Sequence, residues 1–515
     1  MTTSTSFQAK TARWTTNLRL VLIVLAVFVL PMAVTAAAPA QDEAPTGITT
    51  EAELRAAWAD PMRTSIELGA DIYLRQCRTG DPIRESARPM TLNGNGHTIR
   101  QTCFEKRVLR QDGTGYLLLK DVILTRGGSD GPGAAVTTRG EIEVVDSRVT
   151  QNLAEEPGGG IFSMRRATIV RSVITGNLAN DDGGGVYARR GGVQVFDSTV
   201  SSNLVDGSGG AIGSTGDILV VRSHVDGNTT DGDGGAIYAD EDGDVTVIDS
   251  TVDGSDADGP GGAIWTLDGD VTVVNSTLNG NRADDRGGAI GGEADVTVIN
   301  STIVRNAAVA HVAGGIWARG DLFVANSTIS NNYAEGQGGG VLGRGVVRLY
   351  YATILDNMAS VAANVGAGER LESFGSIIGP ARTMGVPGHV QPTERNCRVS
   401  DSASFGHNFV TDASCGLNHP SDAVGQGSPM LGPLVEDERS GEIQLEIRLP
   451  ESGSPVIDAI PEADCGFGPF DDAIAQERHL EGLIEDRLAL IGTDQRGVGR
   501  PQGPACDVGA VEVEQ

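Results

Sequence analysis

The hydrophobic residues in the middle of the chain follow short alternating runs. Between about residues 121 and 360, pairs of aliphatic residues stand one position apart, as at Ile142 and Val144, and a third follows across a bend, as at Val149. Alternation with a period of two predicts β-strands with one buried face, and no helical periodicity competes with it in this stretch.

These strands belong to a repeat of 25 to 27 residues that two markers keep in phase. A glycine turn precedes an aliphatic residue at Val136, Ile161, Val186, Ile212, Ile237, Ile264, Ile290, Ile316 and Val341. A serine recurs at Ser147, Ser172, Ser198, Ser223, Ser250, Ser276, Ser301 and Ser327. Sustained self-similarity at this period predicts a solenoid. The expected fold is all-β: a single-stranded right-handed parallel β-helix over residues 91–380, with a short N-terminal capping helix and an irregular, disulfide-bearing C-terminal module.

An asparagine follows each serine after five residues, and only Ser255 interrupts the series. The positions are Asn152, Asn177, Asn203, Asn228, Asn281, Asn306, Asn332 and Asn357. An asparagine at a bend can hydrogen-bond its own turn and its equivalents in the neighbouring coils. We therefore interpret the series as a structural ladder; a row of ligand-binding amides is the alternative.

The repeat unit has a recognisable form. Gly-Gly-Ala-Ile followed by a strand and an asparagine resembles the β-helix repeats of the pectate-lyase-like superfamily and of polymorphic outer-membrane proteins. Residues 91–99 resemble the entry coil of such proteins. Residues 41–90 are expected to form an N-terminal cap, in which Thr50 to Asp60 predict an amphipathic helix over the open apolar end of the tube.

The period is lost in residues 381–515. The succession of motifs at 453–459, 493–497 and 506–512 resembles the choice-of-anchor Q module, which implies an exported surface protein. Neither a hydrophobic tail nor a basic terminus follows the motifs in this sequence, so a secreted or loosely cell-surface-associated protein is expected. Residues 470–490 are rich in Glu, Ala and Leu and predict an inserted helix.

Residues 1–40 have the three parts of a secretory signal peptide. Lys10, Arg13 and Arg19 precede an apolar run from Leu20 to Val34, and small residues around Ala38 follow it. The apolar run is shorter than the roughly 20 residues that span a membrane. Cleavage is therefore expected, with an uncleaved N-terminal anchor as the alternative and no transmembrane segment in the mature chain.

The six cysteines lie outside the regular repeats, which in an exported chain indicates disulfides. They are Cys77, Cys103, Cys397, Cys415, Cys465 and Cys506. Sequential pairing is the most economical of the possible connectivities. Zinc is the alternative, although no Cys-x-x-Cys or Cys/His spacing supports it.

The composition and net charge of the chain limit the classes of ligand that it can bind. The net charge of −29 disfavours nucleic acid, anionic lipid and polyuronates as ligands unless cations intervene. With 71 glycines and only 4% aromatic residues, the chain suits a narrow aliphatic tube. We expect a monomer that binds a glycan or a cell-envelope component.

Arginines give the best candidate for a ligand site. Arg165, Arg166, Arg189 and Arg190, with Arg139 before them, occupy nearly equivalent places in three consecutive coils. Because coils stack about 4.8 Å apart, these guanidinium groups would form a basic patch able to hold sulfate or carboxylate groups. A solvated row of turn residues, balanced by nearby acids, is the alternative.

Asp240, Asp242 and Asp244 are the candidate metal ligands. Calcium binds clusters of oxygen ligands in flexible loops. The run lacks the pattern of a helix–loop–helix calcium site, so a structural calcium and a solvated acidic loop both remain open. No other cofactor is expected.

No catalytic residues are identified, because no converging carboxylates or Ser/His/Asp arrangement can be argued from spacing. The leading hypothesis is a non-catalytic exported protein whose lateral surface binds glycans or the cell envelope. The resemblance to the pectate-lyase-like superfamily implies, as an alternative, a polysaccharide lyase or glycoside hydrolase. A passive envelope structural protein is the second alternative.

Overall fold

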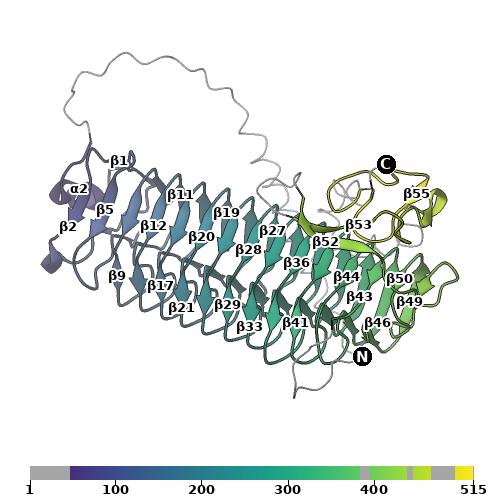
Figure 1. Ribbon diagram of the computed structural model, residues 1–515. Coiled ribbons are helices and arrows are strands. Elements are labelled where there is room, and N and C mark those ends of the chain that lie inside the picture. The colour runs from purple at the N-terminus through teal and green to yellow at the C-terminus, as the bar shows by residue number, and fades with distance from the viewer. Residues whose placement is uncertain (1–46, 383–394, 438–444, 466–492, 514–515) are drawn as a thin grey trace, which may run out of the picture.

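The computed structural model describes residues 47–382, 395–437, 445–465 and 493–513. The expected signal peptide at 1–40 and the expected helix at 470–490 lie outside these residues. The described chain winds into a long parallel β-helix (Figure 1), so the predicted fold class is confirmed. The coils are right-handed, the sense that parallel crossover connections adopt almost without exception. Within the described ranges, no helix is long and apolar enough to cross a membrane.

Each regular coil passes through four short strands. In one coil these are β22 (Ile212–Ser214), β23 (Ile218–Val221), β24 (His224–Asp226) and β25 (Thr229–Thr230). Their equivalents stack into four sheets, numbered here I to IV in that order. Sheet I has 13 strands, from β3 (Ile83–Arg84) to β48 (Cys397–Val399), and sheet II has 14, from β1 (Ser65–Glu67) to β49 (Ser402–Gly406). Sheet III has 15 strands, from β2 (Ile72–Leu74) to β51 (Ala423–Val424). Sheet IV is the smallest of the four, with 9 strands from β9 (Gly128–Ser129) to β41 (Tyr333–Ala334).

The alternating aliphatic residues fill the inside of the tube. In β11 (Ile142–Val145), Ile142 and Val144 point inward and are buried, and Val149 joins them from β12 (Arg148–Thr150). Equivalent residues of successive coils stack in register, and one continuous core runs from Leu54 to Leu417. Each coil can bury its apolar residues only against its neighbours, so the repeat pattern itself specifies the stack.

The helix α2 (Glu51–Ala59) closes the N-terminal end, which confirms the predicted capping helix. Thr50 and Glu53 form a reciprocal capping box at its first turn. Trp58 is fully buried, and its indole N–H donates to the carbonyl of Arg110 at 3.0 Å. The helix thus covers the apolar end of the core.

Strand stacking extends beyond the range predicted for the tube. It begins at β1, inside the range assigned to the N-terminal cap, and continues to β51, inside the range assigned to the C-terminal module. Backbone pairing needs only extended segments in register, whereas the prediction rested on the glycine and serine markers, which are absent from the end coils.

Three disulfides join the cysteines in sequential pairs: Cys77 with Cys103, Cys397 with Cys415, and Cys465 with Cys506. The first lies in the N-terminal coils. The second lies in the last coils of the tube. The third fastens β54 (Ile460–Pro461) to the strand β55 (Ala505–Cys506) beside it.

The C-terminal module, defined here as the described residues from 431 to 513, folds back onto the outside of the tube (Figure 1). Its hairpin of β52 (Leu431–Glu436) and β53 (Glu446–Pro450) reaches sheet III, where the Thr302 hydroxyl donates to the Glu446 carbonyl at 2.8 Å. The module therefore covers the C-terminal coils and leaves the N-terminal coils uncovered.

The asparagine series forms a ladder at the corner between sheets III and IV. The backbone N–H of Asn177 and its side-chain amide both donate to Oδ1 of Asn203, at 3.0 Å each. The same amide also donates to the carbonyl of Val149 at 3.1 Å. These buried amides therefore find partners within the stack, as buried polar groups require.

Candidate binding surface

The predicted arginines lie in the turn between sheets I and II. Strand β14 (Ile161–Ser163) pairs with β18 (Val186–Ala188), and Ala188 stands opposite Ser163. Arg189 therefore lies beside Met164 in the preceding coil, and Arg190 lies beside Arg165. The structure thus brings the predicted arginines together, but in two staggered lines rather than one.

Arg139 completes this group, because Thr138 at the end of β10 (Val136–Thr138) stands opposite Ser163. The name arginine patch is used below for Arg139, Arg165, Arg166, Arg189 and Arg190. Arg166 is half-buried and pairs with Glu141 at 3.1 Å. The other four side chains are exposed.

Those four exposed arginines form no ion pair with any residue in the described part of the chain. Elsewhere in the regular coils, the exposed Arg126, Arg148 and Arg344 stand singly without an ion pair among the described residues, whereas other exposed arginines are held by carboxylates. Arg171 donates through Nε and Nη2 to Asp146 at 2.7 and 3.0 Å, and Arg222 makes the same two contacts with Asp197 at 2.7 and 2.9 Å. The arginine patch is therefore a local concentration of uncompensated positive charge.

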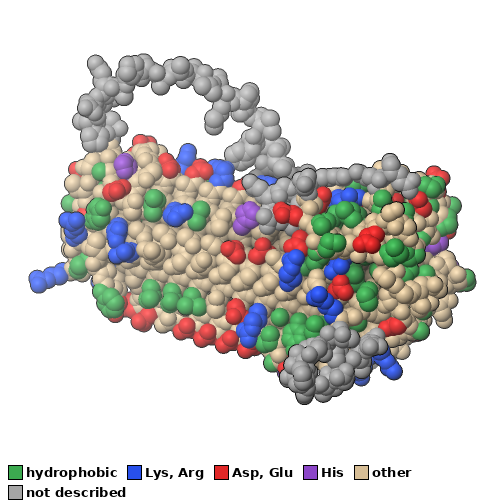
Figure 2. Space-filling view, in the orientation of Figure 1, with side chains coloured by type: hydrophobic (Ala, Val, Ile, Leu, Met, Phe, Trp, Pro, Cys, Tyr) green, Lys and Arg blue, Asp and Glu red, His purple; other side chains and the backbone are tan. Residues whose placement is uncertain are grey.

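The negative charge is concentrated on another edge. Exposed carboxylates follow sheet IV in successive coils at Glu155, Glu156, Asp181, Asp206, Asp231 and Asp258. Figure 2 shows acidic side chains gathered along this lower edge of the tube, next to a run of apolar side chains. The separation of the two charges leaves the arginine patch accessible to an anion that the molecule as a whole repels.

Aromatic residues lie on the outer face of sheet I beside the arginine patch. Phe162 and Tyr187 stack with ring centroids 6.1 Å apart, and both are 4% exposed. Burial is the main cause that raises the pKa of Tyr187 to about 12. These buried rings pack against the glycine turns that cover them and present no exposed face on which a sugar could stack.

The aromatic row continues to coils further along the tube. Trp265 and Trp317 stack at 5.7 Å across Gly291, where a Cβ atom would lie 2.4 Å from the Trp265 ring. Arg286 lies over the Trp317 ring at 4.6 Å. This row was not predicted from the sequence. Its signal is the residue directly after the aliphatic marker of each repeat, which is aromatic in several coils.

The acidic loop has a structural role in the stack. Oδ1 of Asp244 accepts the backbone N–H of Asp270 at 2.8 Å, and its own N–H donates to Asp217 at 3.3 Å. The same contact recurs from Asp270 to Asp295 and from Asp295 to Asp321. This aspartate ladder was not predicted from the sequence, although each of these residues directly precedes an aliphatic strand residue.

Asp240 and Asp242 do not join Asp244 in a metal site. The carboxylate of Asp240 accepts the backbone N–H of Glu241 at 2.8 Å, while Asp242 is exposed. Among the residues that the structure describes, no three His, Cys, Asp or Glu side chains are grouped to hold a metal ion. At the predicted position the three described carboxylates are therefore not grouped as metal ligands.

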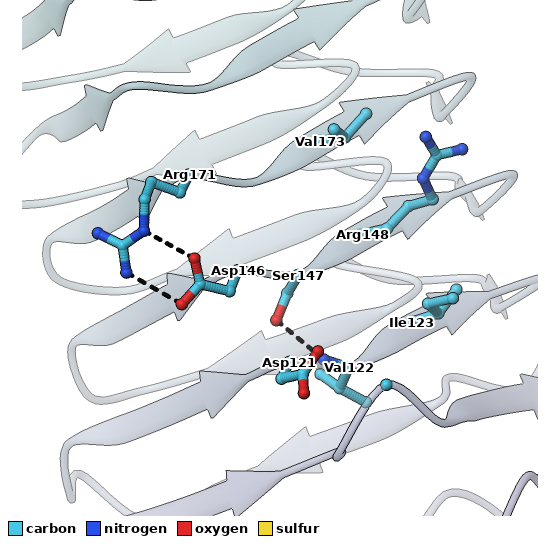
Figure 3. Close-up of a pocket in the computed structure, with 9 residues that line it drawn as sticks. Asp121, Val122, Ile123, Asp146, Ser147, Arg148, Arg171 and Val173 are labelled. Carbon is cyan, nitrogen blue, oxygen red and sulfur yellow. Dashed lines mark hydrogen bonds and ion pairs between the residues drawn. The ribbon is translucent and has the colours of Figure 1, made fainter. Parts of the chain in front are cut away.

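A shallow cavity of about 370 Å³ lies at the corner between sheets II and III in the N-terminal coils (Figure 3). Its lining consists of Gly96, Asp121, Val122, Ile123, Asp146, Ser147, Arg148, Arg171 and Val173. Figure 3 shows the Arg171 guanidinium lying against the Asp146 carboxylate, with Arg148 apart from that pair. Ser147 accepts the Val122 N–H at 3.1 Å, so its hydroxyl already serves the stack.

Two family models match separate parts of the chain. A pectate lyase-like adhesive domain matches residues 46–152, and a right-handed β-helix region matches residues 159–332. No curated protein and no solved structure matches the chain. The arginine patch draws residues from both matched regions. The resemblance of the C-terminal part to the choice-of-anchor Q module lies beyond both matches and stays a prediction.

Proposed function

We propose that this protein is an exported, non-catalytic adhesin whose arginine patch binds an anionic glycan of the cell envelope or its surroundings. The observation that carries the proposal is a set of four exposed guanidinium groups on three adjacent coils that pair with no carboxylate of the described residues. Guanidinium groups form bidentate, charge-assisted hydrogen bonds with carboxylate and sulfate oxygens. A repeat of about 4.8 Å between coils suits an extended polymer that carries several such groups.

Two further findings support the proposal. One matching family model describes an adhesive domain. The three disulfides are typical of exported proteins. Cleavage of the glycan by a lyase or hydrolase is the rival function, and the same assay can detect it.

The test is binding of the purified protein to polygalacturonate, chondroitin sulfate and a neutral glucan, with and without calcium. The variant Arg165→Ala/Arg189→Ala/Arg190→Ala removes three unpaired charges. The variant Arg171→Ala/Arg222→Ala/Arg282→Ala is the matched control, since it removes three arginines that are held by carboxylates.

We expect binding to an anionic glycan that weakens as salt rises and that the patch variant loses by about tenfold or more. The control variant should bind like the wild type. If both variants lose glycan binding equally, the loss reflects the change in net charge and not the arginine patch. Unchanged binding in the patch variant would place the glycan site elsewhere. New reducing ends or unsaturated products would establish an enzyme instead.

A further inference from the structure

The C-terminal module shows how an irregular chain segment binds the corner between sheets II and III. The side-chain amide of Asn326 donates to the carbonyl of Thr493 at 2.9 Å. The amide of Gln495 donates to the carbonyl of Ser301 at 3.1 Å and to the hydroxyl of Thr302 at 2.9 Å. The corner thus holds polypeptide through polar groups of the tube.

An apolar column runs beside this corner and continues past the module. It consists of the last outward-facing residue of each sheet II strand. Under the module its members are Val274, Ile299, Ala325, Tyr350 and Phe374, which pack with Val456, Ile460 and Val508. Toward the N-terminus the column continues as Ile248, Val221, Phe196, Val170 and Val145. The last three are only partly buried in the described structure.

The cavity in Figure 3 continues the same corner into coils that the described part of the module does not cover, called the uncovered corner below. Arg171 stands in the column that Asn326 occupies under the module, and both have the left-handed backbone angle φ 44°. Nε and Nη2 of Arg171 are held by Asp146, and its Nη1 donates to no described residue. Arg222 is held by Asp197 in the same way. Each arginine therefore presents an N–H donor where Asn326 binds a backbone carbonyl.

The uncovered corner differs chemically from the covered one. The column reads Asn275, Asn300, Asn326 and Tyr351 under the module, and Asp121, Asp146, Arg171, Asp197, Arg222 and Asp249 outside it. Each guanidinium in the uncovered part has a carboxylate directly beside it, so a uniformly charged polymer meets repulsion as well as attraction. The apolar column beside it favours apolar side chains instead.

We propose that the uncovered corner, over the coils from Asp121 to Arg222, binds an extended segment of a partner polypeptide. The segment places apolar side chains on Val145, Val170 and Phe196. Its backbone carbonyls accept hydrogen bonds from Arg171 and Arg222. This surface is separate from the arginine patch, which lies at the opposite edge of sheet II, so either can function without the other.

The test uses short random peptides displayed on phage and selected on the full chain, then synthesised with a fluorescent label for anisotropy titrations. The groove variant is Phe196→Asp. The matched control is Leu204→Asp, which puts the same charge on an exposed residue of sheet IV in the same coil. Arg171→Gln is a second groove variant on the surface, and circular dichroism checks that all three fold.

We expect selected peptides rich in apolar residues, with a dissociation constant raised about tenfold by Phe196→Asp, several-fold by Arg171→Gln and less than about twofold by the control. Glycan binding through the arginine patch should be unchanged in all three variants. Failure to select any peptide, or peptide binding that both groove variants leave intact, would overturn the proposal. Loss of glycan binding in Phe196→Asp would show that the corner serves a polysaccharide instead.

Discussion

The N-terminal and C-terminal coils share one backbone and one kind of core, yet they present opposite surfaces. From about residue 274 onward, the last outward-facing residue of each sheet II strand is apolar and lies under the C-terminal module. In the preceding coils the same column is partly exposed, and ion pairs such as Asp146–Arg171 stand at the corner beside it. The inward-facing side chains specify the tube, whereas the outward-facing side chains decide what each group of coils contacts.

The boundary between the two halves coincides with the interruption of the asparagine ladder. Ser255 replaces the asparagine in this coil, and nearby Asp253 interacts electrostatically with Glu446 of the module. The ladder therefore runs as two segments, one in the uncovered coils and one under the module. Three substitutions test how far the halves behave as separate units.

The largest effect is expected from Arg500→Ala, which breaks the interior of the module. Arg500 pairs with Glu512 at 2.7 Å, both side chains are 1% exposed, and its guanidinium lies 4.2 Å from the centre of the Tyr351 ring. Removing one partner of a buried pair costs about 3–5 kcal/mol, because the other charge stays buried and unpaired. Hydrogen exchange should show that the module loses protection.

In the same experiment the N-terminal coils should keep their protection. Arg222→Ala is the control: it removes an exposed pair, which contributes only about 0–1 kcal/mol. Loss of protection throughout the tube in Arg500→Ala would show that the two halves unfold together.

The second effect concerns pH at the boundary. Burial is the main cause that raises the pKa of Asp253 to about 7, and the charges of Asp226 and Glu446 add to it. The folded state therefore binds a proton that the unfolded chain releases near pH 4, and stability falls as pH rises from about 4 to 7. Asp253→Asn keeps an acceptor for the Asn279 N–H and has no charge to bury.

Asp253→Asn should therefore gain about 1–2 kcal/mol over the wild type at pH 8, with the difference vanishing near pH 4. Urea unfolding at several pH values measures it, with the exposed Asp206→Asn, whose charge does not act on Asp253, as the comparison. A constant difference across this range would contradict the assignment to Asp253.

The smallest effect is expected from joining the two ladder segments. Ser255→Asn supplies the missing side chain between Asn228 and Asn281, and one added buried hydrogen bond contributes about 1 kcal/mol. Asn203→Ser is the matched control, since it opens a similar gap inside the intact segment. Urea unfolding should become more cooperative in the first variant and less so in the second. Opposite changes would mean that the corner at Ser255 cannot accept an asparagine.

Much of the fold could be predicted because the contacts of a solenoid are periodic in the sequence. Residues 25 to 27 positions apart are neighbours in space, so the aliphatic columns could be predicted from the repeat. The capping helix could be predicted separately, from the amphipathic pattern of Thr50 to Asp60. The aspartate ladder was equally periodic, yet the acidic run around Asp244 suggested only a calcium site or a solvated loop. The local run of acids suggested these two alternatives, whereas the position of each aspartate just before a sheet II strand indicates a hydrogen bond between neighbouring coils.

The surface was less predictable. The sequence placed the arginines in neighbouring coils. Their stagger, the salt bridge of Arg166 and the lack of ion pairs between the other four and any described residue depend on strand register and side-chain geometry. The burial of Phe162 and Tyr187 under glycine turns likewise depends on how the loops close. These features arise from packing outside the tube, which the periodic signal does not describe.

The sequence by itself determined a β-helix, because each coil must bury its aliphatic residues against an identical neighbour. Only the tertiary structure decided which face stays open. The Thr302 hydroxyl meets the Glu446 carbonyl across 144 positions, and Asn326 meets Thr493 across 167. Such contacts join a repeating surface to a non-repeating segment, so they cannot be predicted from the repeat in the sequence. They depend on the match of shape and polarity between the folded module and the outer columns of the tube.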